Sequence, residues 1–163
     1  MWFPRPFQGE GRHDNPDTYG CLYLADRAVS CTVEQLAAFR GQRLVASLLK
    51  RRGLPLALAA IEIPDRAAIL DLDDPAVLSS ERLRPSLVAT RDRAITQPQA
   101  LALHRAHPDV AGLRWWSTWE AQWANVTIFD RTAARLRLVE VTELTLGHPA
   151  VEAAAEFFGL RVV

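Results

Sequence analysis

The chain has 163 residues, 49% of them hydrophobic, and its 19 basic residues balance 19 acidic ones. This length is typical of one domain with a single core, and the hydrophobic content excludes a disordered chain. The zero net charge argues against direct nucleic-acid binding, since proteins of that class usually carry a basic excess. The sequence has no apolar run of membrane-spanning length and no evident signal peptide, so we expect a cytoplasmic protein without membrane contact.

The first quarter of the chain predicts a loop, a strand and a helix in that order. Residues 1–20 contain three prolines and three glycines, which indicates irregular structure. The apolar run at 21–25 predicts a buried strand. A helix should follow from residue 27 or 33 to residue 40, capped either by Asp26 or by Thr32 in capping-box spacing.

The remaining elements mix short strands with helices. A helix is predicted at 44–51, ending before Gly53. Asp74 and Pro75, an N-cap followed by proline at the first helical position, predict a short helix near Val77. Further helices are predicted at 97–107 and 149–159, and strands at 56–63, 67–72, 112–116, 125–129 and 136–144. This irregular order favours a mixed α+β fold over a doubly wound sheet.

Residues that bind metals elsewhere do not form a familiar pattern here. Cys21 and Cys31 lack zinc-ligand spacing and are expected to be reduced thiols. His104 and His107 are three residues apart in a predicted helix, but no carboxylate accompanies them at a usual spacing. The acids between 71 and 74 include the helix cap. We therefore expect no metal.

The stretch GRHDNP, residues 11–16, sets a cation, an imidazole and an acid in a turn before the first strand. Asn15 and Pro16 are ordinary turn residues, and many surface loops are polar for no further reason. A loop held by a rigid scaffold can also position chemical groups. Arg12 is then the candidate for binding an anion, because its guanidinium group offers a fixed fork of donors.

Four of the five tryptophans lie in WWSTWEAQW, residues 115–123, which contains no Lys or Arg. Stacking on nucleic-acid bases is therefore not favoured, and the segment predicts core packing or one wall of a ligand pocket. Ser117, taken alone, would cap the end of a strand. Glu34, taken alone, is a surface acid, because it lies away from the apolar face of its predicted helix.

The order and spacing of these residues resemble the RES domain family, which is named for its Arg, Glu and Ser. Arg12 precedes Asn15 and Pro16, Tyr23 lies in a strand, Glu34 follows eleven residues later, and Ser117 follows the strand GLRWW. The resemblance covers most of the chain. It implies a single compact domain over residues 1–163, with a mixed sheet, flanking helices and an ADP-ribosyltransferase-like fold.

The resemblance also implies a function. RES proteins are typically toxins of bacterial toxin–antitoxin pairs that cleave the nicotinamide–ribose bond of NAD and pass ADP-ribose to water or phosphate. NAD would thus be a substrate, and the implied partners are a helix-turn-helix antitoxin and further copies of the chain within the complex. Two alternatives stay open, namely transfer of ADP-ribose to a protein side chain and a non-catalytic interaction module.

By position, the resemblance assigns a role to four side chains. Arg12 would bind the diphosphate and Tyr23 would stack on the nicotinamide or the adjoining ribose. Glu34 would stabilise positive charge on the ribose or activate the attacking group, and Ser117 would hydrogen-bond the ribose or the amide. One departure concerns His13, which stands where the family often has Trp or Phe. The other is that only eleven residues precede Arg12.

Overall fold

The computed structural model describes residues 3–163 and divides the chain into two units. The first unit combines Met1–Leu24 with Ile63–Arg137, and the second combines Ala25–Glu62 with Leu138–Val163. Each unit is thus built from two separate stretches of sequence. The predicted mixed α+β class is confirmed, because both units contain helices and paired strands.

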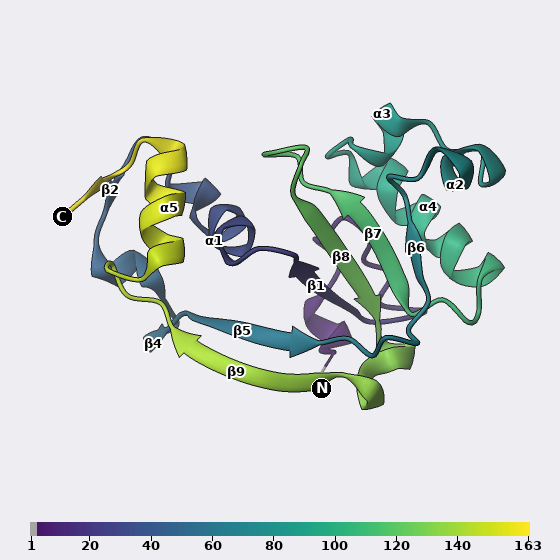
Figure 1. The fold of residues 1–163 in the computed structure, drawn as a ribbon, viewed down its shortest axis with the longest axis horizontal. Coiled ribbons are helices and arrows are strands. Elements are labelled where there is room, and N and C mark those ends of the chain that lie inside the picture. Colours follow the sequence, from purple (N-terminus) through teal and green to yellow (C-terminus); the bar gives the residue numbers. More distant parts are fainter. Residues whose placement is uncertain (1–2) are drawn as a thin grey trace. The chain divides into compact units, whose positions relative to one another are not determined.

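A four-stranded sheet forms the framework of the first unit (Figure 1). Its strands lie in the order β1 (Cys21–Ala25), β8 (Ala124–Phe129), β7 (Gly112–Trp116) and β6 (Ile69–Asp71). β7 pairs in parallel with β6 and antiparallel with β8. The sheet is therefore mixed, and all four of its strands were predicted from apolar runs.

The helices of the first unit are α2 (Pro75–Ser80), α3 (Pro85–Val88) and α4 (Arg93–Ala106), with short 3-10 turns at Arg5–Phe7 and Asp130–Arg135. Asp74 caps α2 as predicted, accepting from the Ala76 N–H group at 2.8 Å. α4 begins four residues before the predicted start, since Asp92 accepts from the Ala94 N–H group and so caps the helix earlier. α3 and the 3-10 turns were not predicted.

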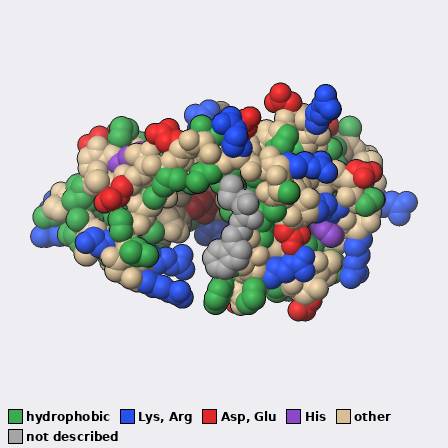
Figure 2. Space-filling model, turned by 90° about the horizontal axis from the view of Figure 1, so that it is seen from below, with side chains coloured by type: hydrophobic (Ala, Val, Ile, Leu, Met, Phe, Trp, Pro, Cys, Tyr) green, Lys and Arg blue, Asp and Glu red, His purple; other side chains and the backbone are tan. Residues whose placement is uncertain are grey.

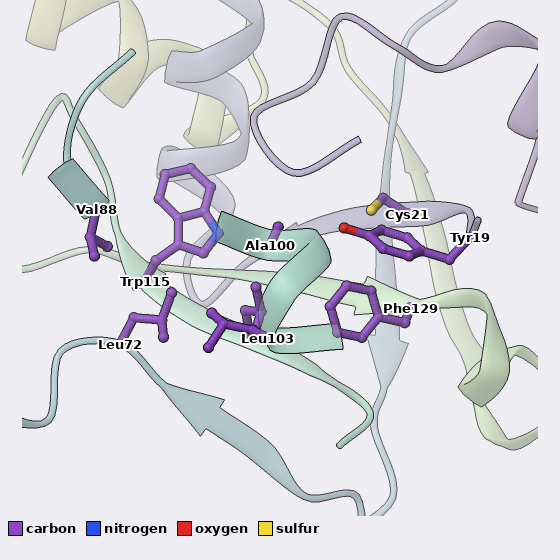
Figure 3. Packing of buried hydrophobic residues seen from close by; sticks show 9 residues of the cluster. Tyr19, Cys21, Leu72, Val88, Ala100, Leu103, Trp115 and Phe129 are labelled. Atoms are coloured by element: carbon purple, nitrogen blue, oxygen red, sulfur yellow. The ribbon is translucent and has the colours of Figure 1, made fainter. Parts of the chain in front are cut away.

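The core of the first unit lies between the sheet and α4 (Figure 3). Its buried members come from the N-terminal loop, three strands, the turn after β6 and two helices: Tyr19, Cys21, Leu72, Val88, Ala100, Leu103, Leu113, Trp115 and Phe129. Trp115 of β7 lies near Val88, while Tyr19 packs against Phe129 with their ring centroids 4.8 Å apart. The N-terminal loop is therefore anchored in the core, although its backbone is irregular.

Gly112, at the start of β7, has no room for a side chain. A Cβ atom there would overlap the carbonyl oxygen of Thr127 and lie 3.1 Å from Cα of Ile128. We expect Gly112→Ala to lower the free energy of unfolding by about 3 kcal/mol, because the clash involves backbone atoms of β8 that cannot move independently. Gly147→Ala, where nothing lies within 4 Å of the added Cβ, is the control. Equal urea midpoints for the two variants would contradict this expectation.

In the second unit, α1 (Ala28–Leu36) packs against α5 (Pro149–Phe158). A two-stranded sheet pairs β5 (Ala57–Glu62) with β9 (Arg137–Glu143), and β2 (Arg43–Leu44) pairs in parallel with β10 (Arg161–Val162). The predicted strands in β5 and β9 are confirmed. Both end signals of α5 are also confirmed, since His148 accepts from the Ala150 N–H group and Gly159 adopts a left-handed φ of 62°.

The predicted helix at 44–51 is wrong. The segment holds the end of β2, a 3-10 turn at Ala46–Leu49 and β3 (Lys50–Arg51), which pairs antiparallel with β4 (Leu54–Pro55). The two residues between β3 and β4 both have positive φ, 52° at Arg52 and 81° at Gly53. Gly53 therefore closes a two-residue hairpin turn and does not end a helix.

The caps predicted for α1 are also wrong. The N-cap residue is Arg27, which makes no capping side-chain hydrogen bond, and the α-helix ends at Leu36 with a 3-10 turn after it. The Thr32 hydroxyl donates to the Ala28 carbonyl within the helix at 2.9 Å, so it does not start a second helix. The earlier of the two expected starts, residue 27, matches the structure to within one residue.

Both cysteines are free thiols, as expected. Among residues 3–163, no helix has the length and apolar character needed to cross a bilayer. On the face shown in Figure 2, Lys and Arg side chains are interspersed with Asp and Glu, in keeping with the zero net charge of the sequence.

Candidate functional site

Asp14 organises the loop that precedes β1. Its carboxylate is buried and accepts from the N–H groups of Gly9 and Gly11 at 2.7 and 2.8 Å. It also accepts from the Tyr23 hydroxyl at 2.7 Å. The Tyr23 oxygen in turn accepts from the His13 N–H group at 2.9 Å. A Cβ atom on Gly11 would lie only 2.5 Å from that phenolic oxygen, so the loop is closely wrapped on Tyr23.

Helix α4 holds the other side of this loop. The Gln97 side-chain amide donates to the Gly11 carbonyl at 2.9 Å, and the Thr96 hydroxyl donates to the Arg12 carbonyl at 2.6 Å. The Asn15 side chain donates to the Gln97 carbonyl at 3.0 Å. Asn15 therefore fixes the turn, as its residue type predicted, and the loop has rigid supports on β1 and α4.

Arg12 is held by hydrogen bonds and by an aromatic ring. Its Nη1 atom donates to the carbonyl oxygens of Val88, at 2.9 Å, and Thr90. Its Cζ atom lies 4.5 Å from the ring centroid of Trp115. A guanidinium group on an indole face gains cation–π attraction, so the orientation of the Arg12 side chain is fixed before any ligand binds.

Ser117 directly follows Trp116, the last residue of β7. Its N–H group donates to the Trp123 carbonyl at 2.8 Å, which extends the pairing with β8 by one step. Its buried hydroxyl oxygen accepts from the Trp119 N–H group at 3.1 Å, the capping role expected of a serine at a strand end. Alternate residues of a strand share a face, so Ser117 follows Trp115 on the side over which Arg12 lies.

Tyr23 combines a bonded hydroxyl group with an accessible ring. The side chain is 39% exposed, although its oxygen is tied to the loop by the Asp14 and His13 contacts. Burial of the hydroxyl group raises the pKa of Tyr23 above its ordinary value, so the phenol remains a donor to Asp14. The exposed ring is suited to stacking against a flat ligand.

Comparison with known proteins shows the family of the chain. The RES domain family model matches residues 1–147. The chain belongs to the RES domain family. No curated relative matches its sequence. A chain in the crystal structure of the M. tuberculosis MbcT–MbcA toxin–antitoxin complex is similar in fold, with a TM-score of 0.60 and 22% identity over 93% of this chain and 76% of that one.

Three of the four residues predicted for the RES site lie in the first unit. Asp14 and His13 link the loop of Arg12 to Tyr23, and Arg12 lies over Trp115, two residues before Ser117 in the sequence. Glu34 lies in the second unit, on the exposed face of α1. Its exposure agrees with the helical spacing in the sequence, and its role in the site stays a prediction.

The surroundings of His13 show how an imidazole fits at a position where the RES family often has Trp or Phe. Its ring is buried edge-on to Trp115, with the centroids 5.4 Å apart. The Trp115 indole N–H group donates to the Thr127 hydroxyl at 3.1 Å, and that hydroxyl lies 2.8 Å from Nδ1 of His13. The imidazole thus keeps an aromatic contact at this position and adds a polar one. It is part of the core that supports Arg12.

Burial of His13 makes the stability of the RES domain dependent on pH. Burial, and then the nearby charge of Arg12, lower the pKa of His13 from 6.5 to about 3. Between these values the unfolded chain binds a proton that the folded chain does not, so stability is full above pH 6.5 and falls as the pH drops towards 3. We expect a loss of about 2 kcal/mol between pH 7 and pH 5 from this group.

Urea unfolding of wild type and His13→Phe at pH 7, 6 and 5 measures this effect. The variant keeps an aromatic ring against Trp115 and has no titrating group at position 13, so its stability should fall less. Burial also lowers the pKa of His104, to about 4, but that residue is common to both proteins and its contribution cancels. Parallel stability curves for the two proteins would contradict a neutral, buried His13.

The residues considered as metal ligands have other partners in the structure. His104 stacks on Tyr19 with the ring centroids 4.3 Å apart, and Asp71 accepts from Arg114 at 2.9 Å. Over residues 3–163, no group of three or more His, Cys, Asp or Glu side chains is placed to hold a metal ion.

Sequence reasoning assigned no role to Asp14. The available signal was its position in a turn, where an aspartate side chain can accept from neighbouring backbone N–H groups.

Proposed function

We propose that this RES domain cleaves the nicotinamide–ribose bond of NAD and transfers ADP-ribose to water or phosphate. The observation that carries the proposal is the fixed guanidinium group of Arg12, which lies over Trp115 and donates to two backbone carbonyls, in a loop that His13 and Asp14 tie to Tyr23. A rigid cation next to an exposed aromatic ring suits a ligand that has both an anionic diphosphate and a flat ring.

The chemistry needs few groups from the protein. The nicotinamide of NAD is a pyridinium, and when its bond to C1′ of the ribose breaks, the electron pair leaves with the nitrogen and nicotinamide departs neutral. No general acid is required. The ribose becomes oxocarbenium-like, as in glycoside hydrolysis, and one carboxylate can stabilise that charge. We assign this carboxylate to Glu34, which would also accept the proton of an attacking water.

The other three residues would bind the substrate. Arg12 would bind the diphosphate through guanidinium donors in fixed geometry, and the ring of Tyr23 would stack on nicotinamide or the adjoining ribose. Ser117 would hydrogen-bond the ribose or the carboxamide. The tryptophans of residues 115–123 would limit the access of water to the reacting carbon.

We further propose that the chain acts in the cytoplasm as the toxin of a toxin–antitoxin pair. Its family membership and its likeness in fold to a chain of a toxin–antitoxin complex support this proposal. The partner would be a helix-turn-helix antitoxin that silences the enzyme, and the toxin would be present in more than one copy within the complex.

Incubation of purified protein with NAD, with and without inorganic phosphate, tests the enzymatic proposal. We expect stoichiometric release of nicotinamide and free ADP-ribose, or its phosphorylated product when phosphate is the acceptor. Label from NAD that becomes attached to protein would favour the protein-acceptor alternative. A folded protein that binds NAD without releasing nicotinamide would favour the interaction module.

A further inference from the structure

A second guanidinium–indole pair lies next to that of Arg12. The Cζ atom of Arg91 is 4.5 Å from the ring centroid of Trp119, the same separation as between Arg12 and Trp115. The Nε and Nη2 atoms of Arg91 also donate to the Thr118 hydroxyl at 3.3 and 3.2 Å. This arginine is therefore held in one orientation, although it lies on the surface.

The two pairs are joined through the backbone on both sides. Arg12 donates to the Thr90 carbonyl, which belongs to the peptide bond that leads into Arg91. The two indole rings come from one segment, and Ser117 stands between them and accepts from the Trp119 N–H group. Both guanidinium groups thus lie at the end of β7 where Ser117 is placed.

Arg91 differs from Arg93 and Arg114 in having no acidic partner among residues 3–163. Arg93 pairs with Glu10 at 2.7 Å and Arg114 pairs with Asp71 at 2.9 Å. Within the described residues, Arg91 forms no ion pair with a carboxylate. An oriented cation with no acidic partner at the edge of a site is available to an anionic ligand.

We infer that Arg91 is a second phosphate-binding cation of the site, beside Arg12. The inference rests on the proposed function for the identity of the ligand. The phosphate group could be the second phosphate of the dinucleotide or a free phosphate that accepts ADP-ribose. Both present the same oxygen atoms to a guanidinium group.

Arg91→Met tests the inference, with Arg93→Met as the matched control two residues away. Methionine keeps an unbranched side chain that can lie on Trp119 but carries no charge. We expect the dissociation constant for ADP-ribose, measured by titration calorimetry, to rise about 10- to 100-fold in Arg91→Met. It should change less than twofold in Arg93→Met, since exposed ion pairs contribute little. Binding of adenosine, which has no phosphate, should not change in either variant.

The arms of this experiment separate the two phosphate sources. Unchanged ADP-ribose binding, together with loss of a stimulation of nicotinamide release by inorganic phosphate, would assign Arg91 to the acceptor. If neither quantity changes, or if adenosine binding falls equally, the inference is overturned. Wild-type protein that binds ADP-ribose but releases no nicotinamide from NAD would contradict the proposed function alone. Wild-type protein that binds no ADP-ribose would contradict both.

Discussion

Glu34→Gln is expected to reduce nicotinamide release from NAD by about 10²- to 10³-fold while the protein stays folded. Loss of one well-placed group that stabilises transition-state charge typically costs about 3–4 kcal/mol. Glutamine has the same shape as glutamate and a similar helix propensity, so the helix itself should be unaffected. The variant should bind ADP-ribose nearly as well as wild type, because the carboxylate acts on the charge of the transition state.

Because Glu34 is exposed, its substitution should leave the packing of α1 unchanged. The residue lies on the exposed face of α1, whereas Val33 and Leu36 are buried on the other face. Glu156→Gln is the control, since it removes an exposed carboxylate from the other helix of the same unit. Nicotinamide release by this variant should equal that of wild type. If Glu34→Gln also releases nicotinamide at the wild-type rate, the catalytic assignment of Glu34 is wrong.

The same variant separates the biological proposals. Expression of the wild-type chain without an antitoxin should arrest growth, and expression of Glu34→Gln to the same level should not. Arrest by the inactive variant would mean that the chain acts through binding and not through consumption of NAD.

Local signals in the sequence predicted the fold correctly at positions where a residue type has only one structural use. The His148 and Pro149 start and the Gly159 stop of α5 are examples, because proline fits the first turn of a helix and glycine tolerates the left-handed conformation after it. Gly53 shows the limit of such signals. The same tolerance of positive φ serves a hairpin turn, and only the pairing of β3 with β4 decides between the two uses.

The functional assignment of the candidate site stays a prediction. Residue types and their order along the chain indicated Arg12, Tyr23 and Ser117, and these three residues share one unit. The site residues are held in place by contacts between distant segments, such as the hydrogen bond from Arg12 to the Val88 carbonyl. A side chain that donates to a backbone carbonyl places no demand on the residue type of its partner, so the sequence carries no trace of it.

Arg12→Lys is expected to raise the KM for NAD by about 10- to 100-fold and to lower the free energy of unfolding by about 1–2 kcal/mol. The guanidinium group bonds to the carbonyls of Val88 and Thr90 through Nη1 while its plane lies over Trp115. A lysine ammonium group is a single point charge and cannot bind these carbonyls and a diphosphate in fixed geometry at the same time. Lost hydrogen bonds to the two carbonyls account for the decrease in stability.

Arg114→Lys is the control for this variant. Arg114 lies on the same strand as Trp115, but it pairs with the Asp71 carboxylate and not with backbone carbonyls. Its KM for NAD should equal that of wild type. Steady-state kinetics of both variants with NAD measure this difference. A normal KM in a folded Arg12→Lys protein would show that the loop fixes this guanidinium group for the sake of the fold, and the diphosphate would have to be bound by other residues.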